Sequence, residues 1–224
     1  MNTVLRCLAL FLVWSKGTPA LAQASTSIAL DEATIAQINA AFDATSLTAE
    51  QLVKMSLARI EAYDKQGPSL RALITVNPEA VEAARKLDFE RRTKGRRSAL
   101  HGIPVVLKDC IDTADMATTA GSVMLEGSVP SRDAFIVERL RQAGAIILAK
   151  ANMSEFASGP AISSIGGQMK NPHDLDRTPL GSSGGSGIAV AAAYTVIAIG
   201  TDTGGRFVIL HLPPVSLASN RPSD

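Results

Sequence analysis

The segment GIPVVLKD, residues 102–109, predicts a short apolar strand that ends at Lys108. After this strand the chain alternates helical and strand patterns, and Gly144 breaks the first helix. The elements expected downstream are helices over residues 133–142 and 187–194 and strands over residues 145–148 and 195–199. A repeated strand–helix–strand order is typical of an α/β layered domain, so we expect a mixed, largely parallel central sheet.

The sequence upstream of this segment follows the same alternation. Ser46 or Thr48 can cap a helix over residues 50–63, whose apolar side chains recur at roughly helical spacing. The other elements expected are a strand over residues 70–76, a charged helix over residues 79–92 opened by Asn77-Pro78, and a solvent-facing basic cluster within residues 91–97.

Composition narrows the class of protein. The 224 residues carry a formal net charge of +1, and 46% of them are hydrophobic but only 4% aromatic. This length supports one sizeable domain with its own core. The near-neutral balance gives no reason to expect nucleic acid or an anionic membrane as a partner. Because His101, His173 and His211 show no metal-ligand spacing, we expect no metal and no cofactor.

The first 24 residues have the pattern of a signal peptide. Arg6 precedes an apolar run over residues 7–14, and the triplet AQA at residues 22–24 has small residues where a signal peptidase needs them. The run is too short for a transmembrane helix. We therefore expect a secreted or periplasmic protein with no stable membrane anchor after cleavage, in which Cys110 is the remaining cysteine. An uncleaved apolar terminus is the alternative.

Three segments that can carry chemistry lie where strands end. They are GIPVVLKD at residues 102–109, GSSGGSG at residues 181–187 and GTDTGG at residues 200–205. Each segment alone is also explained by ordinary structure, because a lysine that ends a strand can simply reach water and glycine-rich runs are common in loops. Their combination and order are therefore more informative than any one of them.

Together and in this order, the three segments resemble the amidase signature family. Supporting stretches are HGIP at residues 101–104, KANMSEF at residues 150–156 and NP at residues 171–172. The resemblance covers residues 47–205, and DRTP at residues 176–179 is similar to the branch that contains bacterial peptide amidases. It implies a layered α/β/α fold, of which this chain would hold the N-terminal half within residues 25–205.

The resemblance also implies a reaction, the hydrolysis of a small-molecule or peptide amide by a Ser–cis-Ser–Lys triad. Lys108 matches the catalytic lysine, and Ser182 matches the bridging serine, whose preceding peptide bond is cis in the family. Burial disfavours the charged form of lysine and can make it a base. A serine hydroxyl can accept one proton while it donates another. The residues expected to bind the oxyanion or the substrate are Thr203, Gly204, Gly205 and Ser183.

Position 206 departs from the family. The nucleophilic serine is expected 24 positions after Ser182, where this chain has Arg206, a residue without a nucleophilic oxygen. Residues 206–224 also lack the family's continuation. Permitted codons for this segment, read in a shifted frame, can encode the family-like IRYPASAAGVSGIKPTVG. We therefore hypothesise a one-base deletion or a sequencing error in the serine codon, which would leave this chain inactive and without the family's second half.

Other interpretations remain open at this stage. A paralogue of the same fold can keep a binding site without the chemistry, and Arg206 is then its own residue. A nucleotide-binding α/β protein is a further alternative, because free N–H groups at the start of a helix attract phosphate. The segment at residues 181–187 lacks the Gly-Lys-Ser/Thr ending of a P-loop, which argues against that alternative. The oligomeric state is not predicted.

Overall fold

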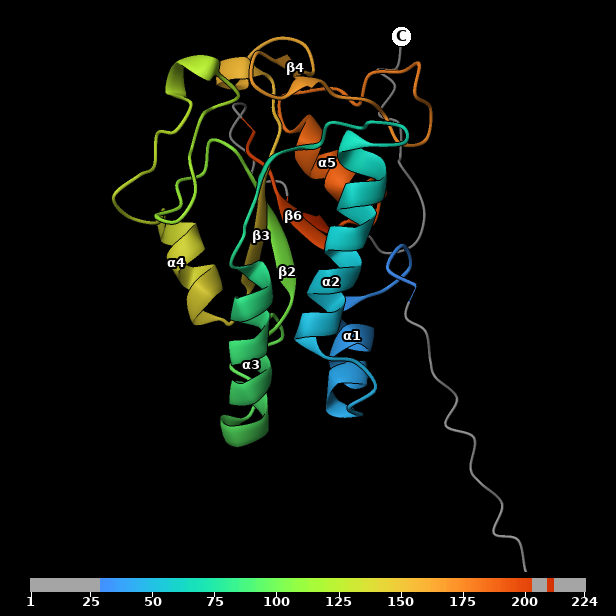
Figure 1. The fold of residues 1–224 in the computed structure, drawn as a ribbon, viewed down its shortest axis with the longest axis vertical. Coiled ribbons are helices and arrows are strands. Elements are labelled where there is room, and N and C mark those ends of the chain that lie inside the picture. Colours follow the sequence, from blue (N-terminus) through green and yellow to red (C-terminus); the bar gives the residue numbers. More distant parts are fainter. Residues whose placement is uncertain (1–28, 203–208, 212–224) are drawn as a thin grey trace, which may run out of the picture.

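The computed structural model describes residues 29–202 and 209–211 of the chain (Figure 1). In this part, a five-stranded sheet has the strand order β1-β3-β2-β6-β7, and a separate hairpin pairs β4 with β5. The strands are β1 (Leu73–Val76), β2 (Pro104–Lys108), β3 (Ile146–Ala151), β4 (Ile162–Ser163), β5 (Gly167–Gln168), β6 (Ile197–Ile199) and β7 (Ile209–His211). The central strands β3, β2 and β6 are parallel, whereas β1 and β7 run antiparallel to their neighbours. The expected mixed α/β sheet is confirmed, and its parallel part is the centre.

The central strands lie inside the protein. Every residue of β2, β3 and β6 is buried, with no alternation of buried and exposed side chains. Figure 1 shows α4 to the left of these strands and α1, α2 and α5 to their right. A parallel sheet that is covered by helices on both faces needs apolar side chains on both faces, which explains the near-continuous apolar runs in the sequence.

Five α-helices surround this sheet in the described part of the chain. They are α1 (Ile35–Asp43), α2 (Ala49–Ile60), α3 (Ala80–Lys94), α4 (Phe135–Gln142) and α5 (Gly184–Ala191). A short π-helix, η1 (Glu61–Lys65), directly follows α2, and two short 3₁₀ helices are η2 (Val123–Leu125) and η3 (Glu155–Ala157). Thr48 caps α2, because its hydroxyl accepts a hydrogen bond from Gln51 N at 3.1 Å. Sequence patterns did not predict α1, which Thr34 and Gln37 open with a capping box. None of the described helices is long and apolar enough to cross a membrane.

The position of α5 differs from the expectation. The helix begins at Gly184 and ends at Ala191, three residues earlier at each end than the predicted range of 187–194. Its first residues are glycines because the backbone packs closely there: a side chain at Gly185 would overlap the carbonyl oxygens of Ala72 and Asn152. As a result, the serines at 182 and 183 directly precede the first turn of α5.

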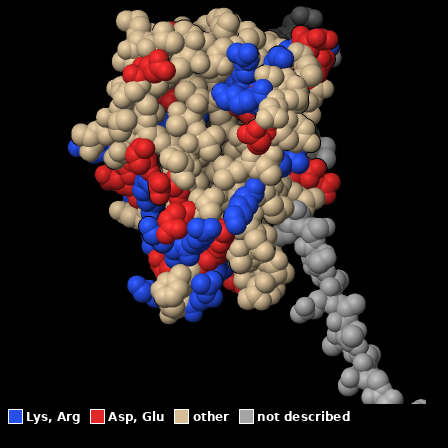
Figure 2. All heavy atoms as spheres, viewed as in Figure 1, with Lys and Arg blue, Asp and Glu red and all other residues tan. Residues whose placement is uncertain are grey.

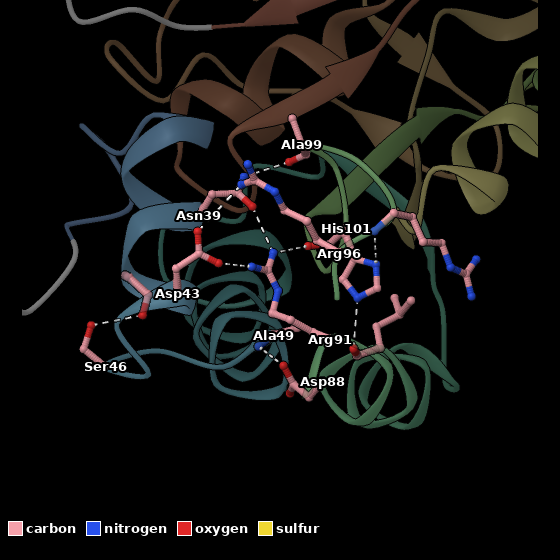
Figure 3. A network of polar contacts seen from close by, with 12 residues as sticks. Asn39, Asp43, Ser46, Ala49, Asp88, Arg91, Arg96, Ala99 and His101 are labelled. Atoms are coloured by element: carbon pink, nitrogen blue, oxygen red, sulfur yellow. Dashed lines mark hydrogen bonds and ion pairs between the residues drawn. The ribbon is translucent and has the colours of Figure 1, made fainter. Parts of the chain in front are cut away.

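Arg91 of α3 joins three parts of the chain (Figure 3). Its guanidinium donates to Asp43 Oδ1 at 2.6 Å and Asn39 Oδ1 at 2.9 Å, both on α1, and to His101 O at 3.3 Å just before β2. The guanidinium also lies 5.0 Å from the ring centroid of Phe42. One arginine therefore fixes α1 and the approach to β2 against α3.

This contact changes the interpretation of the basic cluster. Arg92, Lys94 and Arg96 are exposed, as expected of a solvent-facing cluster. The side chain of Arg91 is only 13% exposed and serves the packing of helices instead. Figure 2 shows basic and acidic side chains intermixed over α3 on this face of the molecule. Arg97, which follows α3, forms an ion pair at 2.5 Å with Glu90 of that helix.

We expect Arg91→Met to lower the free energy of unfolding by about 1–3 kcal/mol, because the substitution leaves acceptors on α1 and before β2 without their donor. Arg92→Met on the same helix is the matched control, and it should change stability by less than about 0.5 kcal/mol. Urea unfolding followed by circular dichroism measures both variants. Equal stabilities of the two variants would contradict the structural role of Arg91.

Candidate active site

Lys108 is buried at the end of β2, where its side chain meets the ends of two other segments. Its side chain has no exposed surface. The Nζ atom donates to Ser182 Oγ at 2.7 Å and to Thr201 Oγ1 at 2.8 Å, with Thr201 O at 3.5 Å. Burial lowers the pKa of Lys108, while the nearby Cys110 and Asp202 act in the opposite direction. The site thus holds a lysine whose charged form is destabilised by burial and whose closest hydrogen-bond partners among the described residues are hydroxyl groups.

Ser182 lies in the loop that leads into α5. The peptide bond between Gly181 and Ser182 is cis, as the family resemblance implies. Ser154 holds this loop in place, because its N–H donates to Ser182 O at 3.0 Å. Its hydroxyl donates to Gly159 O at 3.1 Å and packs where a side chain at position 181 would stand. Glycine at position 181 is therefore required by the packing of the loop that carries Ser182.

Ser183 connects the same loop to the end of β6. Its Oγ donates to Thr201 O at 3.0 Å and accepts from Thr201 N at 3.1 Å. Ser186 makes a second link of this kind, with Oγ donating to Ile199 O at 3.1 Å. The sequence suggested Ser183 for oxyanion or substrate binding. In the structure, its hydrogen bonds join the start of α5 to the segment that follows β6.

A second buried lysine lies on the other face of the sheet. Lys150 pairs with Leu107 in the register of β3 with β2, so its side chain points away from the face that Lys108 occupies. Its Nζ lies 3.8 Å from Asp109 Oδ1 and donates to Thr118 Oγ1 at 2.8 Å. Burial lowers the pKa of Lys150 and raises that of Asp109, and the opposite charge of each partner counteracts both changes.

Sequence reasoning missed this pair, although Asp109 lies in the segment GIPVVLKD and Lys150 in the segment KANMSEF. Asp109 Oδ2 also accepts from the N–H groups of Thr119 at 3.1 Å and Gly121 at 3.1 Å. The pair therefore orders the loop that follows Lys108. The available signal was the occurrence of two lysines at the ends of apolar strands, but local patterns do not contain the strand register that separates their faces.

Several expected site residues lie outside the described residues. These are Thr203, Gly204, Gly205 and Arg206, which follow the end of the segment described to residue 202. His101, in contrast, has a structural place: its Nε2 lies 2.9 Å from Leu87 O, and its Nδ1 accepts from Arg97 N at 3.2 Å. Within residues 29–202, no cluster of His, Cys, Asp and Glu is arranged to hold a metal ion.

Comparison with known proteins finds a matching family and similar sequences. The family model described as Amidase matches residues 51–207. A probable amidase of Arabidopsis thaliana is 43% identical over 214 residues, which cover 92% of this chain and 41% of the relative. One subunit of the glutamyl-tRNA(Gln) amidotransferase of Pseudomonas aeruginosa is 44% identical over 177 residues, which cover 79% of this chain and 36% of the relative.

Solved structures that resemble this chain include a peptide amidase and an amidase family protein. The native peptide amidase of Stenotrophomonas maltophilia is 46% identical, with a TM-score of 0.75 over 77% of this chain and 36% of that chain. An amidase family protein of Bacillus anthracis is 40% identical, with a TM-score of 0.74 over 76% of this chain and 35% of that chain. The chain thus spans between 35% and 41% of the length of these four proteins.

The contact between position 181 and Ser154 is testable by a double-mutant cycle. We expect Gly181→Ala to lower the free energy of unfolding by about 1–3 kcal/mol, because the new methyl group overlaps Ser154 Oγ. Ser154→Ala removes that oxygen, so the double variant should lose less stability than the sum of the two single variants. Urea unfolding of the four proteins measures the coupling, and strict additivity would contradict this packing.

The buried ion pair predicts a pH-dependent loss of stability. We expect Lys150→Met to cost about 3–5 kcal/mol at pH 7, because Asp109 is left buried without its partner. A carboxyl group whose pKa is raised by folding stabilises the protein at low pH, and this contribution is lost as the pH rises through the raised pKa. The deficit should therefore grow between about pH 4 and pH 7.

The matched control for this variant is Lys54→Met. Lys54 pairs with Glu50 at 2.7 Å on the surface, where its side chain is 56% exposed. An exposed pair of this kind contributes about 0–1 kcal/mol. Urea unfolding at several pH values measures both variants, and a deficit for Lys150→Met that shrinks as the pH rises would contradict the placement of Asp109.

Proposed function

The chain belongs to the amidase family, and from that premise we propose that its site is built to hydrolyse the C–N bond of a carboxylic amide. The observation that carries the proposal is the 2.7 Å hydrogen bond between the buried Lys108 Nζ and Ser182 Oγ. In this proposal Lys108 is the base and Ser182 is the bridging serine of a Ser–cis-Ser–Lys triad. The substrate is a small-molecule or peptide amide.

The proposed reaction begins with two proton transfers. The neutral amine of Lys108 accepts the proton of Ser182, and Ser182 accepts the proton of the nucleophilic serine as that serine attacks the amide carbonyl. The tetrahedral intermediate then collapses as the leaving amine takes a proton back along the same relay. Water hydrolyses the resulting ester by the same two transfers. Backbone N–H groups at Thr203, Gly204 and Gly205 are the proposed donors to the oxyanion.

The relay requires a lysine that loses its proton easily. A lysine in water has a pKa near 10.4, so about 0.1% or less is neutral at pH 7. Burial of Lys108 lowers this pKa and increases the neutral fraction. Ser182 is suited to the middle position, because one hydroxyl can donate to the amine while it accepts from a second hydroxyl.

We propose that the chain as it stands does not complete this reaction. Arg206 occupies the position of the nucleophile, and its guanidinium has no nucleophilic oxygen. The family-like peptide in the shifted frame of residues 206–224 supports a one-base change in the serine codon as the cause. Sequencing of the gene tests this cause directly, since a continuation without a family-like frame would refute it.

The functional prediction compares the present chain with the product of the frame-restored gene. We expect no turnover of simple aryl or peptide amides by the present chain, because loss of a nucleophile of this type costs on the order of a million-fold. The frame-restored product should hydrolyse such amides, and Lys108→Met or Ser182→Ala should abolish that activity. Lys108-dependent turnover by the present chain would overturn the proposed inactivity.

A ligand-binding role without chemistry is the second candidate, and the presence of Arg206 is the observation that favours it. The same experiment separates the two. A binding protein gains no turnover from the restored frame, whereas the proposed hydrolase does. Calorimetric titration of the present chain with an amide that the restored product hydrolyses then measures any binding that remains.

We also propose that residues 1–24 direct the protein out of the cytoplasm. The apolar run over residues 7–14 and the AQA triplet at residues 22–24 support this proposal. N-terminal sequencing of the protein recovered from a bacterial periplasm or medium should find Ser25 as the first residue. Recovery of the uncleaved chain alone would refute the proposal.

A further inference from the structure

Among the described residues, Thr201 supplies two of the three acceptors around the amino group of Lys108. Its Oγ1 lies 2.8 Å from Lys108 Nζ and its carbonyl oxygen lies 3.5 Å away, while Ser182 Oγ lies at 2.7 Å. The carbonyl contact is at the long limit of a hydrogen bond, so the hydroxyl is the stronger of the two. The motif that contains Thr201 suggested oxyanion donors further along the chain, and the proposed relay gives this threonine no role.

The number of protons on the amine determines what these acceptors do. An ammonium group has three N–H donors, and here each of the three faces an acceptor. A neutral amine has two N–H donors and one lone pair. When the two oxygens of Thr201 accept both N–H groups, the lone pair points at the third acceptor among the described residues, Ser182 Oγ. That direction is the one in which a base has to receive the serine proton.

The hydroxyl hydrogen of Thr201 also has a place to go. Cys110 Sγ lies 3.8 Å from Thr201 Oγ1, within reach of a hydrogen bond to sulfur. Sulfur is a weak acceptor, so it can take this hydrogen without competing for the amine protons. The lone pairs of the Thr201 hydroxyl are then free to accept from Lys108.

Thr201 is itself held in place by the segment that carries the bridging serine. Ser183, the neighbour of Ser182, bonds to both the N–H and the carbonyl oxygen of Thr201. The carbonyl oxygen and the Oγ1 atom that face Lys108 therefore move together with the loop that presents Ser182. One connected set of hydrogen bonds therefore sets the relative positions of Lys108, Thr201 and Ser182.

We propose that Thr201 is a positioning residue that accepts the two N–H groups of neutral Lys108 and thereby directs its lone pair at Ser182. This inference rests on the proposed function, in which Lys108 acts as the base. In the transfer, the Ser182 O–H bond breaks and an N–H bond forms at Lys108. The new ammonium then donates back to Ser182 Oγ and still donates to both oxygens of Thr201.

The first test measures Lys108 in the chain as it exists, by NMR titration of protein labelled in its lysine side chains. Lys108→Met and Lys150→Met identify the two buried signals. In Thr201→Val the charged form of Lys108 loses an acceptor, so we expect its pKa to fall by about one unit. Thr201→Ser keeps the hydroxyl and should keep the pKa.

Lys150 is the internal control, because it bonds to Thr118 and to Ala117 O on the other face of the sheet. Its titration should not change in either Thr201 variant. The Lys150 signal also reports that a variant is folded, and Thr201→Ala replaces the valine variant if that variant unfolds. An unchanged Lys108 pKa on loss of the Thr201 hydroxyl would overturn the inference.

The second test uses the frame-restored product and its pH–rate profile. In Thr201→Val we expect the maximal rate to fall by about ten- to a hundred-fold, because the base is no longer aimed. At the same time, the acid limb should move to lower pH by about one unit, because Lys108 loses its proton more easily. A purely structural defect lowers the rate without moving this limb, and Thr201→Ser should restore both properties.

The two tests separate this inference from the proposed function. If Thr201→Val lowers the Lys108 pKa but the restored product hydrolyses no amide, the proposed contact of Thr201 with Lys108 stands and the hydrolase proposal falls. If the restored product is active and the acid limb stays in place in Thr201→Val, the inference falls and the hydrolase proposal stands.

Discussion

The burial of the Lys108 amino group is the constraint on which the rest of this structure depends. An ammonium group removed from water loses several kcal/mol of solvation unless other groups replace its hydrogen bonds. Here those groups come from the loop before α5 and from the segment that follows β6. The end of β2 must therefore meet two segments that are distant in sequence. The parallel order of β3, β2 and β6 makes this possible, because the carboxyl ends of parallel strands lie at one edge of the sheet.

The two buried lysines show that burial alone does not make a base. Burial lowers the pKa of both side chains. Lys150 has the carboxylate of Asp109 beside it, which favours the charged form, and it anchors the loop after β2. Asp202 also favours the charged form of Lys108, but the hydrogen-bond partners of Lys108 in the described part of the chain are two hydroxyl groups and a carbonyl oxygen, which can bond to either protonation state. The same residue type therefore has a structural role on one face of the sheet and a setting suited to proton transfer on the other.

The sequence predicted the fold class and the meeting of Lys108 with Ser182, because the motifs that carry them lie at strand ends in a recognisable order. It could not predict the first turn of α5, since glycine is among the poorest helix formers and only tertiary packing at Gly185 explains its use. The Asp109–Lys150 pair depends on strand register, which local patterns do not contain. Thr201 lies in the segment GTDTGG, but a sequence motif does not show which atoms of a residue face Lys108.

The arrangement around Lys108 favours a hydrolase over a pure binding module. Within the described residues, the hydrogen bonds of Lys108 come from Ser182 and Thr201, and Ser183 bonds to Thr201. None of these bonds involves position 206, so the loss of a nucleophile there, as proposed above, leaves them in place. A binding site for a neutral amide has no need of a buried lysine, and burial of an amino group has a desolvation cost that other groups must offset. The two closest hydrogen-bond partners of Lys108 among the described residues are hydroxyl groups. A buried lysine in such surroundings is suited to moving a proton, which ligand binding alone does not require.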